Sequence, residues 1–135
     1  MEQAEFSDYI IPKVLEHFPR FMEHCIAKPG GVVDIEYKSP QGLLTLWLTT
    51  QDKEITIGFS GNHSLGDFHT HMSLFGANTP DEEVIEAIKF MEDIITDRLT
   101  IVYSTVLGYS LGDLDEIREY QQPDELIGVT SWSKL

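Results

Sequence analysis

The sequence has little cysteine, no long apolar run and no apolar stretch at its start. One cysteine, Cys25, excludes a disulfide within the chain, and such sparing use of cysteine is typical of the reducing cytosol. No segment approaches the roughly 18 apolar residues that a membrane-spanning helix needs. The first residues, Met-Glu-Gln-Ala-Glu-Phe, are acidic and unlike a secretory signal. We therefore expect a cytoplasmic protein that does not enter a membrane.

Basic residues are also scarce. The chain has nine Lys and Arg against 23 Asp and Glu, which gives a formal net charge of −14. Because an acidic surface repels phosphate groups, we expect no direct binding to nucleic acid or anionic lipid. The charge is uneven, since residues 81–125 hold thirteen acidic and three basic residues and carry a net charge of −10. Such a region would speed encounter with a basic protein. The alternative is that the acidity only keeps the protein soluble.

Sequence motifs of several enzyme classes are missing. No Gly-x-Ser-x-Gly stretch occurs, which argues against the nucleophile elbow of α/β-hydrolases. The glycine-containing stretch 108–112 lacks the Lys-Ser/Thr of a phosphate-binding loop. His24 directly precedes Cys25 on a predicted helix, where adjacent side chains point apart, so a Cys–His nucleophile has poor geometry.

The length of 135 residues is most simply one domain that covers residues 1–135. Apolar periodicity predicts a first helix that Pro19 kinks or splits and a second helix that begins with a Thr79 cap. Short connections between the early strands predict an antiparallel meander. The expected helices cover residues 7–27, 79–95 and 113–120, and the expected strands cover residues 33–37, 43–50, 55–59, 66–72, 98–107 and 126–132. The sequence thus predicts an α+β fold, a mainly antiparallel β-sheet meander packed against two main helices.

The apolar positions of these elements predict the core. Most of it is expected from Trp47, Ile55, Ile57, Phe59, Val84, Ile88, Met91, Ile95, Ile101 and Tyr103.

Residues 67–71, Asp-Phe-His-Thr-His, are the most distinctive stretch of the chain. Alternate side chains of a strand share a face, so Asp67, His69 and His71 are expected together. Two imidazoles and a carboxylate would suit zinc and leave a position for an activated water. The same three side chains could instead form a polar patch that is structural or that binds another protein. The sequence leaves these alternatives open.

The His-Thr-His pattern resembles the JAMM metalloprotease signature. That signature is His-Ser/Thr-His, seven residues, Ser, two residues and Asp; here His69 and His71 are followed at this spacing by Thr79 and Glu82. The departures are Thr for Ser, Glu for Asp, Met72 where the family commonly has proline, and no clear counterpart of the upstream catalytic glutamate. The resemblance implies a zinc-dependent hydrolase that uses the face of Asp67 and the two histidines. Thr79 and Glu82 equally fit a helix capping box, which needs no metal.

A second resemblance covers residues 44–104. It is carried by Trp47, by a Thr-Ile-Gly-Phe strand within residues 54–59, by the Gly-Asp-Phe-His-Thr-His segment 66–71 and by the acidic helix that ends at Ile95. These features resemble a group of small acidic bacterial proteins that includes immunity proteins of polymorphic or contact-dependent toxin systems. The Met-Ser that follows the histidines differs from the aromatic residue and Asp common in that group. The resemblance implies a cytosolic, non-enzymatic antidote without a cofactor.

Such an antidote would bind a basic partner, a toxin domain, and block it by occlusion. Many toxin domains are basic nucleases, since they must hold a polyphosphate, and an acidic protein could mimic that backbone. The alternative for any single carboxylate is a solvated helix face. The candidate partner-binding residues are Asp81, Glu82, Glu83, Glu86, Asp93, Asp113, Asp115, Glu116 and Glu119.

Overall fold

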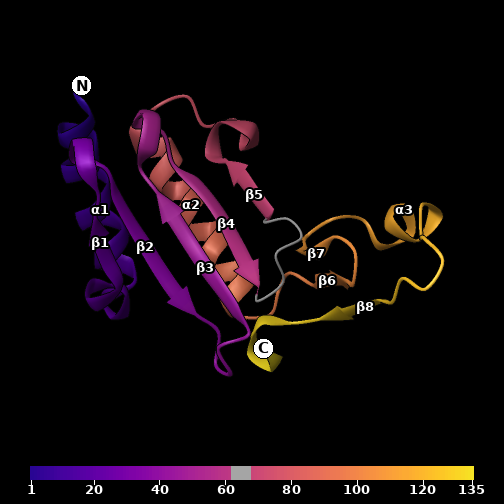
Figure 1. The fold of residues 1–135 in the computed structure, drawn as a ribbon. Helices are drawn as coiled ribbons and strands as arrows, with labels where there is room; N and C mark the ends of the chain where they lie inside the picture. Colours follow the sequence, from indigo (N-terminus) through magenta and orange to yellow (C-terminus); the bar gives the residue numbers. More distant parts are fainter. Residues whose placement is uncertain (62–67) are drawn as a thin grey trace.

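The computed structural model describes residues 1–61 and 68–135 and shows an α+β fold (Figure 1). Its larger sheet has five antiparallel strands that are neighbours in chain order, so the predicted meander is confirmed. The strands are β1 (Cys25–Ala27), β2 (Val33–Lys38), β3 (Leu44–Thr49), β4 (Thr56–Gly61) and β5 (Phe68–His71).

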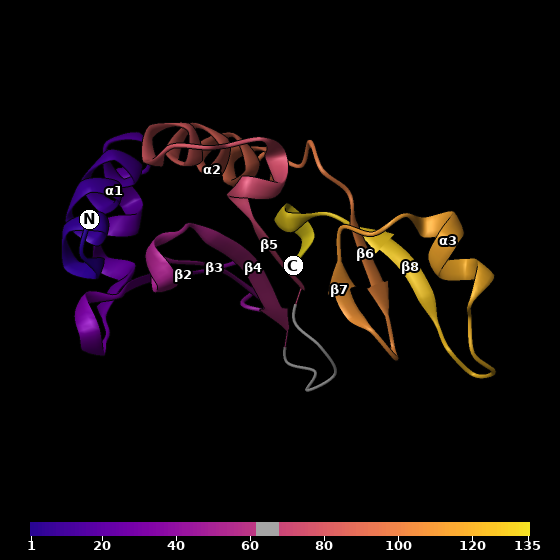
Figure 2. The same ribbon diagram turned by 90° about the horizontal axis from the view of Figure 1, so that it is seen from above.

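Two helices, α1 (Gln3–His17) and α2 (Pro80–Ile95), cover one face of the larger sheet, and its other face carries no helix in the described parts of the chain (Figure 2). The alternation of β3 explains this arrangement, because Leu44, Leu46 and Leu48 are buried while the intervening side chains are only half-buried. We call the helix-free side, which bears Trp47 of β3 and His69 of β5, the open face.

The second helix begins as the sequence predicts. The Thr79 hydroxyl accepts a hydrogen bond from the Glu82 amide at 3.2 Å, and Pro80 occupies the first helical position, where its missing N–H costs nothing. Val84, Ala87, Met91 and Ile94 form the buried stripe of this helix.

The first helix differs from its predicted range of 7–27. It starts earlier and ends at His17, and the predicted split at Pro19 is confirmed. The prediction that helix continues to residue 27 is wrong, since the chain forms a 3₁₀ turn and then strand β1. Ser7, the first residue of the predicted range, lies inside the helix, and its buried hydroxyl lies 2.7 Å from the Thr50 hydroxyl and 2.6 Å from the Gly31 carbonyl oxygen.

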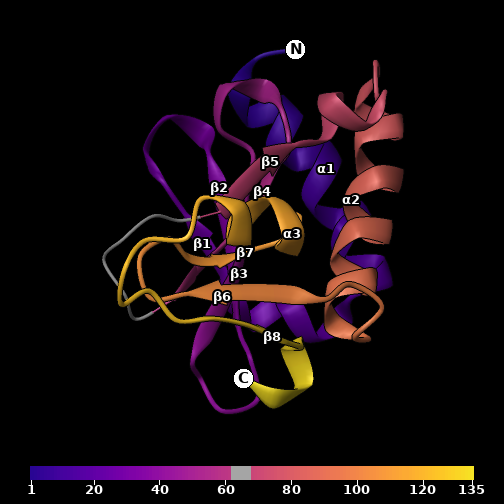
Figure 3. The same ribbon diagram turned by 90° about the vertical axis from the view of Figure 1, so that its right-hand side faces the viewer.

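The C-terminal part of the chain forms a second, three-stranded antiparallel sheet that sequence analysis did not predict. Figure 3 shows this sheet nearest the viewer. Its strands are hydrogen-bonded in the order β7-β6-β8. In the chain, a short helix, α3, lies between β7 and β8. The elements are β6 (Ile101–Ser104), β7 (Gly108–Ser110), α3 (Leu114–Glu119) and β8 (Ile127–Thr130).

A tight turn explains why the predicted strand 98–107 is shorter in the structure. The Ser104 hydroxyl accepts hydrogen bonds from the amides of Val106 and Leu107, each at 3.0 Å. Gly108 then adopts a φ of 80°, which reverses the chain into β7. The predicted loop 108–112 therefore contains a strand. Short 3₁₀ segments lie at Pro19–His24, Pro29–Gly31, Gln51–Lys53, Met72–Phe75 and Trp132–Lys134.

One core joins the two sheets. Trp132 and Leu135, after β8, are buried in the same cluster as the side chains under α1 and α2. Of the predicted core residues, Ile55, Ile57, Phe59, Val84, Met91 and Ile101 are buried, and Ile88 and Ile95 pack partly buried against them. Trp47 and Tyr103 are only half-buried and lie outside this cluster, so their assignment to the core is wrong. Among the described residues, no helix has the length and apolar character needed to cross a membrane.

Candidate functional site

His69 and His71 lie on one face of β5, as predicted. Their ring centroids are 5.6 Å apart and the rings meet edge to face at 79°. Asp67, the third member of the predicted group, lies outside the described residues. The strand register places these imidazoles on the open face, with His69 opposite Gly58 and His71 opposite Thr56.

An aromatic row crosses the open face. Strand pairing sets Trp47, Gly58 and His69 side by side on β3, β4 and β5. The indole of Trp47 fills the space over Gly58 that a side chain would need, and its ring centroid lies 6.5 Å from that of His69. The indole nitrogen donates a hydrogen bond to the Ser60 hydroxyl at 3.1 Å. The large side chain of Trp47 therefore occupies the space that Gly58, which has no side chain, leaves on the neighbouring strand.

A carboxylate and a hydroxyl orient the ring of His71. Its Nδ1 is 2.9 Å from a carboxylate oxygen of Glu54 and 2.9 Å from the Thr56 hydroxyl. A proton on Nδ1 would be donated to Glu54, which would leave Nε2 facing away from the pair. Both side chains are 37% exposed, so the contact adds little stability and chiefly fixes the direction of the ring.

The described residues hold no group of three or more His, Cys, Asp or Glu side chains that is suited to a metal ion. Two residues of the JAMM-like pattern are engaged elsewhere. Thr79 caps α2, and the carboxylate of Glu82 accepts a hydrogen bond from the Asn78 amide at 2.6 Å. Both side chains therefore stabilise the start of α2, in an arrangement close to a capping box in which Glu82 bonds the amide one residue before the cap.

Two other acidic residues in the first turns of α2 bond to neighbouring elements. The Tyr9 hydroxyl donates to the Asp81 carboxylate at 2.7 Å, and this hydrogen bond raises the pKa of Tyr9. The Glu83 carboxylate accepts from the Ile55 amide at 3.0 Å. Burial raises the pKa of Glu83 above its usual value. Both carboxylates thus hold the helix to the rest of the fold.

Farther along α2, Asp93 lies 3.3 Å from the guanidinium of Arg98. Glu86 is half-buried and has no hydrogen bond or ion pair among the described residues. Of the five predicted partner-binding residues on α2, only Glu86 therefore has no bond to another described residue.

The acidic residues of α3 are arranged differently. Asp113 caps the helix, since its carboxylate accepts from the amides of Asp115 and Glu116 at 2.9 and 3.1 Å. The side chains of Asp115, Glu116 and Glu119 are exposed and make no hydrogen bond or ion pair within the described chain. The nine predicted residues therefore form two separate groups, because α2 lies on the larger sheet and α3 beyond the smaller one (Figures 1 and 2).

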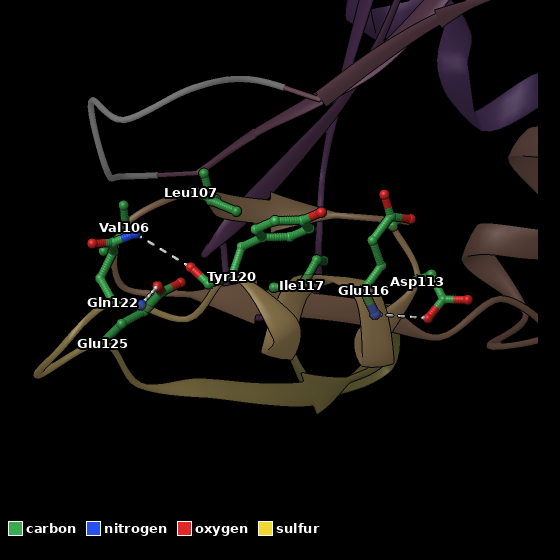
Figure 4. A pocket seen from close by; sticks show the side chains of 9 residues that line it. Val106, Leu107, Asp113, Glu116, Ile117, Tyr120, Gln122 and Glu125 are labelled. Carbon is green, nitrogen blue, oxygen red and sulfur yellow. Dashed lines mark hydrogen bonds between the residues drawn. The ribbon is translucent and has the colours of Figure 1, made fainter.

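A pocket of about 470 Å³ lies between α3 and the turn that follows β6 (Figure 4). Asp113 and Glu116 stand at one end of it, and Gln122 and Glu125 at the other, with the ring of Tyr120 between them. The apolar lining residues are Val106, Leu107, Ile117 and Tyr120. Sequence analysis missed this apolar lining. Its signal was the pair Ile117 and Tyr120, which are three residues apart in the predicted helix 113–120 and are therefore expected on one face.

Glu125 is the buried carboxylate of this pocket. It accepts hydrogen bonds from the Ser104 hydroxyl and, at 2.8 Å, from the Gln122 amide. The hydrogen bond from the Gln122 amide lowers the pKa of Glu125 below its usual value, and the hydrogen bond from the Ser104 hydroxyl contributes a smaller lowering. The charged form of Glu125 therefore ties the loop after α3 to strand β6.

We expect Glu125→Gln to lower the free energy of unfolding at neutral pH. In this variant the free energy of unfolding should also fall less as the pH is lowered. A carboxyl whose pKa is lowered by folding stabilises the protein above its unfolded pKa of about 4.3, and this contribution is lost as the pH falls through the folded pKa. Urea unfolding at neutral pH and at acidic pH measures the effect, with the exposed Glu119→Gln as control. Equal acid sensitivity of the wild type and Glu125→Gln would contradict it.

Comparisons of the chain with protein-family models, with curated proteins and with solved structures gave no significant match.

Proposed function

We propose that this protein is a non-enzymatic, acidic binding protein of immunity type, which blocks a basic bacterial toxin domain by covering it. The observation that carries the proposal is that the negative charge is largely uncompensated. The chain has 23 acidic residues, yet among its described residues Asp93 and Arg98 form the only ion pair between a carboxylate and a lysine or arginine. The free carboxylates leave a strong negative field around the protein.

Such a field favours a basic partner. Complementary charge speeds diffusional encounter, while apolar anchors at the centre of an interface supply most of its affinity. A toxin that holds a polyphosphate substrate has a basic active site, and an acidic protein that covers this site would exclude the substrate. The resemblance of residues 44–104 to small acidic immunity proteins supports the same proposal, and it includes the strand pattern and the His-Thr-His segment as well as the acidic helix.

The test is a titration of the purified protein with the purified product of the adjacent gene. We expect a stoichiometric complex by isothermal calorimetry, and loss of the toxin's activity on its substrate in proportion to complex formation. A net charge of −14 also predicts that the complex forms fastest at low salt. An adjacent gene product that neither binds at low salt nor loses activity would contradict the proposal.

Zinc-dependent hydrolysis at Asp67, His69 and His71 is the alternative function, and the carboxylate-oriented ring of His71 is the observation that favours it. In our proposal the two imidazoles are structural and hold no ion. We therefore expect protein that has been incubated with zinc and desalted to retain far less than stoichiometric metal by elemental analysis. His69→Ala should leave that content unchanged. Stoichiometric zinc that is lost in His69→Ala would instead support the hydrolase.

A further inference from the structure

We propose that the pocket between α3 and the β6–β7 turn is the docking site for the partner. The occupant we infer is a protein segment with an apolar anchor residue flanked by lysine and arginine. The inference rests on the proposed function and assigns it a location that the charge alone does not give. We call this surface, formed by Val106, Leu107, Asp113, Glu116, Ile117 and Tyr120, the acidic cleft.

The first argument is the apolar surface that the smaller sheet leaves exposed. Tyr120 is 71% exposed and Leu107 is 54% exposed, although both are large apolar side chains. Val129 in strand β8 and Leu126 just before it are exposed as well. Single exposed apolar residues are ordinary, but a group of them on one small unit marks an interaction surface.

The second argument is the charge at the border of this apolar surface. Glu116 and Asp113 both line the pocket, and Asp115 and Glu119 stand on the same short helix. Arg118 is the one basic residue on α3, and it forms no ion pair with any of these acids within the described chain. An apolar centre whose acidic border has no cationic partner in the described chain complements an apolar anchor with a basic border.

The other surfaces fit a basic partner less well. A second pocket, of about 380 Å³, lies against α2 and is also apolar, but its lining includes the basic residue Lys89 together with Glu86, and its other acidic residue, Asp93, is paired with Arg98. The open face presents Trp47 packed over Gly58 and His71 held by Glu54, so its polar groups are engaged within the sheet. The acidic cleft differs from the pocket against α2 because its lining combines exposed apolar side chains and carboxylates with no lysine or arginine.

The size of the cleft suits an anchor residue. Interface energy is concentrated in a few large side chains that fill pockets, with Trp, Tyr and Arg the most frequent. A pocket of about 470 Å³ that opens to solvent accommodates such a side chain. Lysine and arginine on either side of the anchor would then reach the carboxylates of Glu116 and Glu119.

A direct test uses short synthetic peptides and amide chemical shifts of the full chain. The first peptide has a central Leu-Trp-Leu flanked by lysine and arginine. One control peptide keeps the basic residues and replaces the centre with Gly-Ser-Gly, and another keeps the centre and replaces the basic residues with glutamine. We expect the first peptide to shift amides of residues 106–125 and to bind at least tenfold more tightly than either control. Shifts centred on α2 or on the open face would overturn the inference.

Substitutions then locate the binding. Leu107→Ser and Tyr120→Ser change exposed side chains, so the fold should be kept, and each is expected to weaken peptide binding about tenfold. Ile85→Ser is the matched control, because Ile85 is an exposed apolar residue on α2, at 64% exposure. Glu116→Gln and Glu119→Gln should weaken binding at low salt, whereas Glu5→Gln on α1 should not. Equal effects of the cleft and control substitutions would overturn the inference.

The same variants separate this inference from the proposed function. If the adjacent gene product binds the wild type and binds Leu107→Ser and Tyr120→Ser equally well, the docking site is wrong and the proposed function stands. If neither the adjacent gene product nor the first peptide binds, both fail. Binding of the gene product that is weakened in the two cleft variants and unchanged in Ile85→Ser supports both.

Discussion

Gly58→Ala is expected to destabilise the protein by about 3 kcal/mol, the upper part of the range for overpacked sites. A Cβ atom on Gly58 would stand 2.8 Å from Cε2 of Trp47, and closer still to Cζ2 of that ring and to the backbone carbonyl oxygen of Phe68. The ring can turn aside, but the carbonyl belongs to the neighbouring strand β5. The strands must therefore separate locally to admit even one methyl group.

Urea unfolding measures this change, and the fold provides a matched control. Gly128 also lies in a strand, β8, and a Cβ atom there would meet no atom within 4 Å. Gly128→Ala should therefore cost little. The Gly58→Ala, Trp47→Ala double variant should recover only part of the loss, because it removes the indole and leaves the carbonyl. A Gly58→Ala protein as stable as the wild type would show that the packing of Trp47 over this glycine is wrong.

Removing three charges from α3 is expected to slow association with the basic partner about tenfold at low salt. The variant combines Asp115→Asn, Glu116→Gln and Glu119→Gln, whose side chains are exposed and without ion pairs in the described chain. Because these charges lie beside the docking site that we propose, their contribution to the encounter is screened less than that of distant charges. The association rate should also depend less on salt.

A second triple variant controls for net charge alone. Glu2→Gln, Glu5→Gln and Asp8→Asn remove the same charge from exposed positions in and next to α1, at the other end of the molecule (Figure 1). Stopped-flow measurements over a range of salt concentrations compare the two. Because salt screens distant charges, the α1 variant should associate almost as fast as the wild type at physiological salt. Equal slowing in both variants would mean that only the net charge matters.

The fold was predictable where local signals and burial agree. Alternating apolar and polar residues in β2, β3 and β4, joined by short connections, predicted the meander. The sequence Thr79-Pro80 predicted the start of α2. Pro19 gave the break after α1, because proline cannot donate the backbone hydrogen bond of a helix interior. These features depend on residues near one another in the chain.

The parts that sequence analysis missed depend on distant pairing. Strand β1 has three residues in an apparently helical segment, and only its pairing with β2 makes it a strand. The smaller sheet depends on the Ser104 turn and on strand β8, more than twenty residues away from β6 in the chain. Trp47 looked like a core residue, but it alternates with the buried Leu46 and Leu48 and therefore lies on the open face, where it packs over Gly58 of the next strand.

The candidate site was predictable in part for the same reason. The sequence shows where the acidic residues are, but not which of them form hydrogen bonds. Glu83 accepts a hydrogen bond from the Ile55 amide because α2 packs beside β4. Glu119 forms no hydrogen bond or ion pair in the described chain. The apolar half of the acidic cleft, with Leu107 and Tyr120, depends on how α3 lies against the β6–β7 turn. Charge composition therefore led to the proposal of a basic partner, and tertiary packing was needed to propose a docking site for it.

Amide hydrogen exchange of the complex with the adjacent gene product tests the central claim most directly. We expect the partner to slow exchange in residues 106–125 and to leave the open-face strands β3 and β5 unchanged. A complex that protects Trp47 and His69 while the amides around Glu116 exchange as fast as in the free protein would contradict the account.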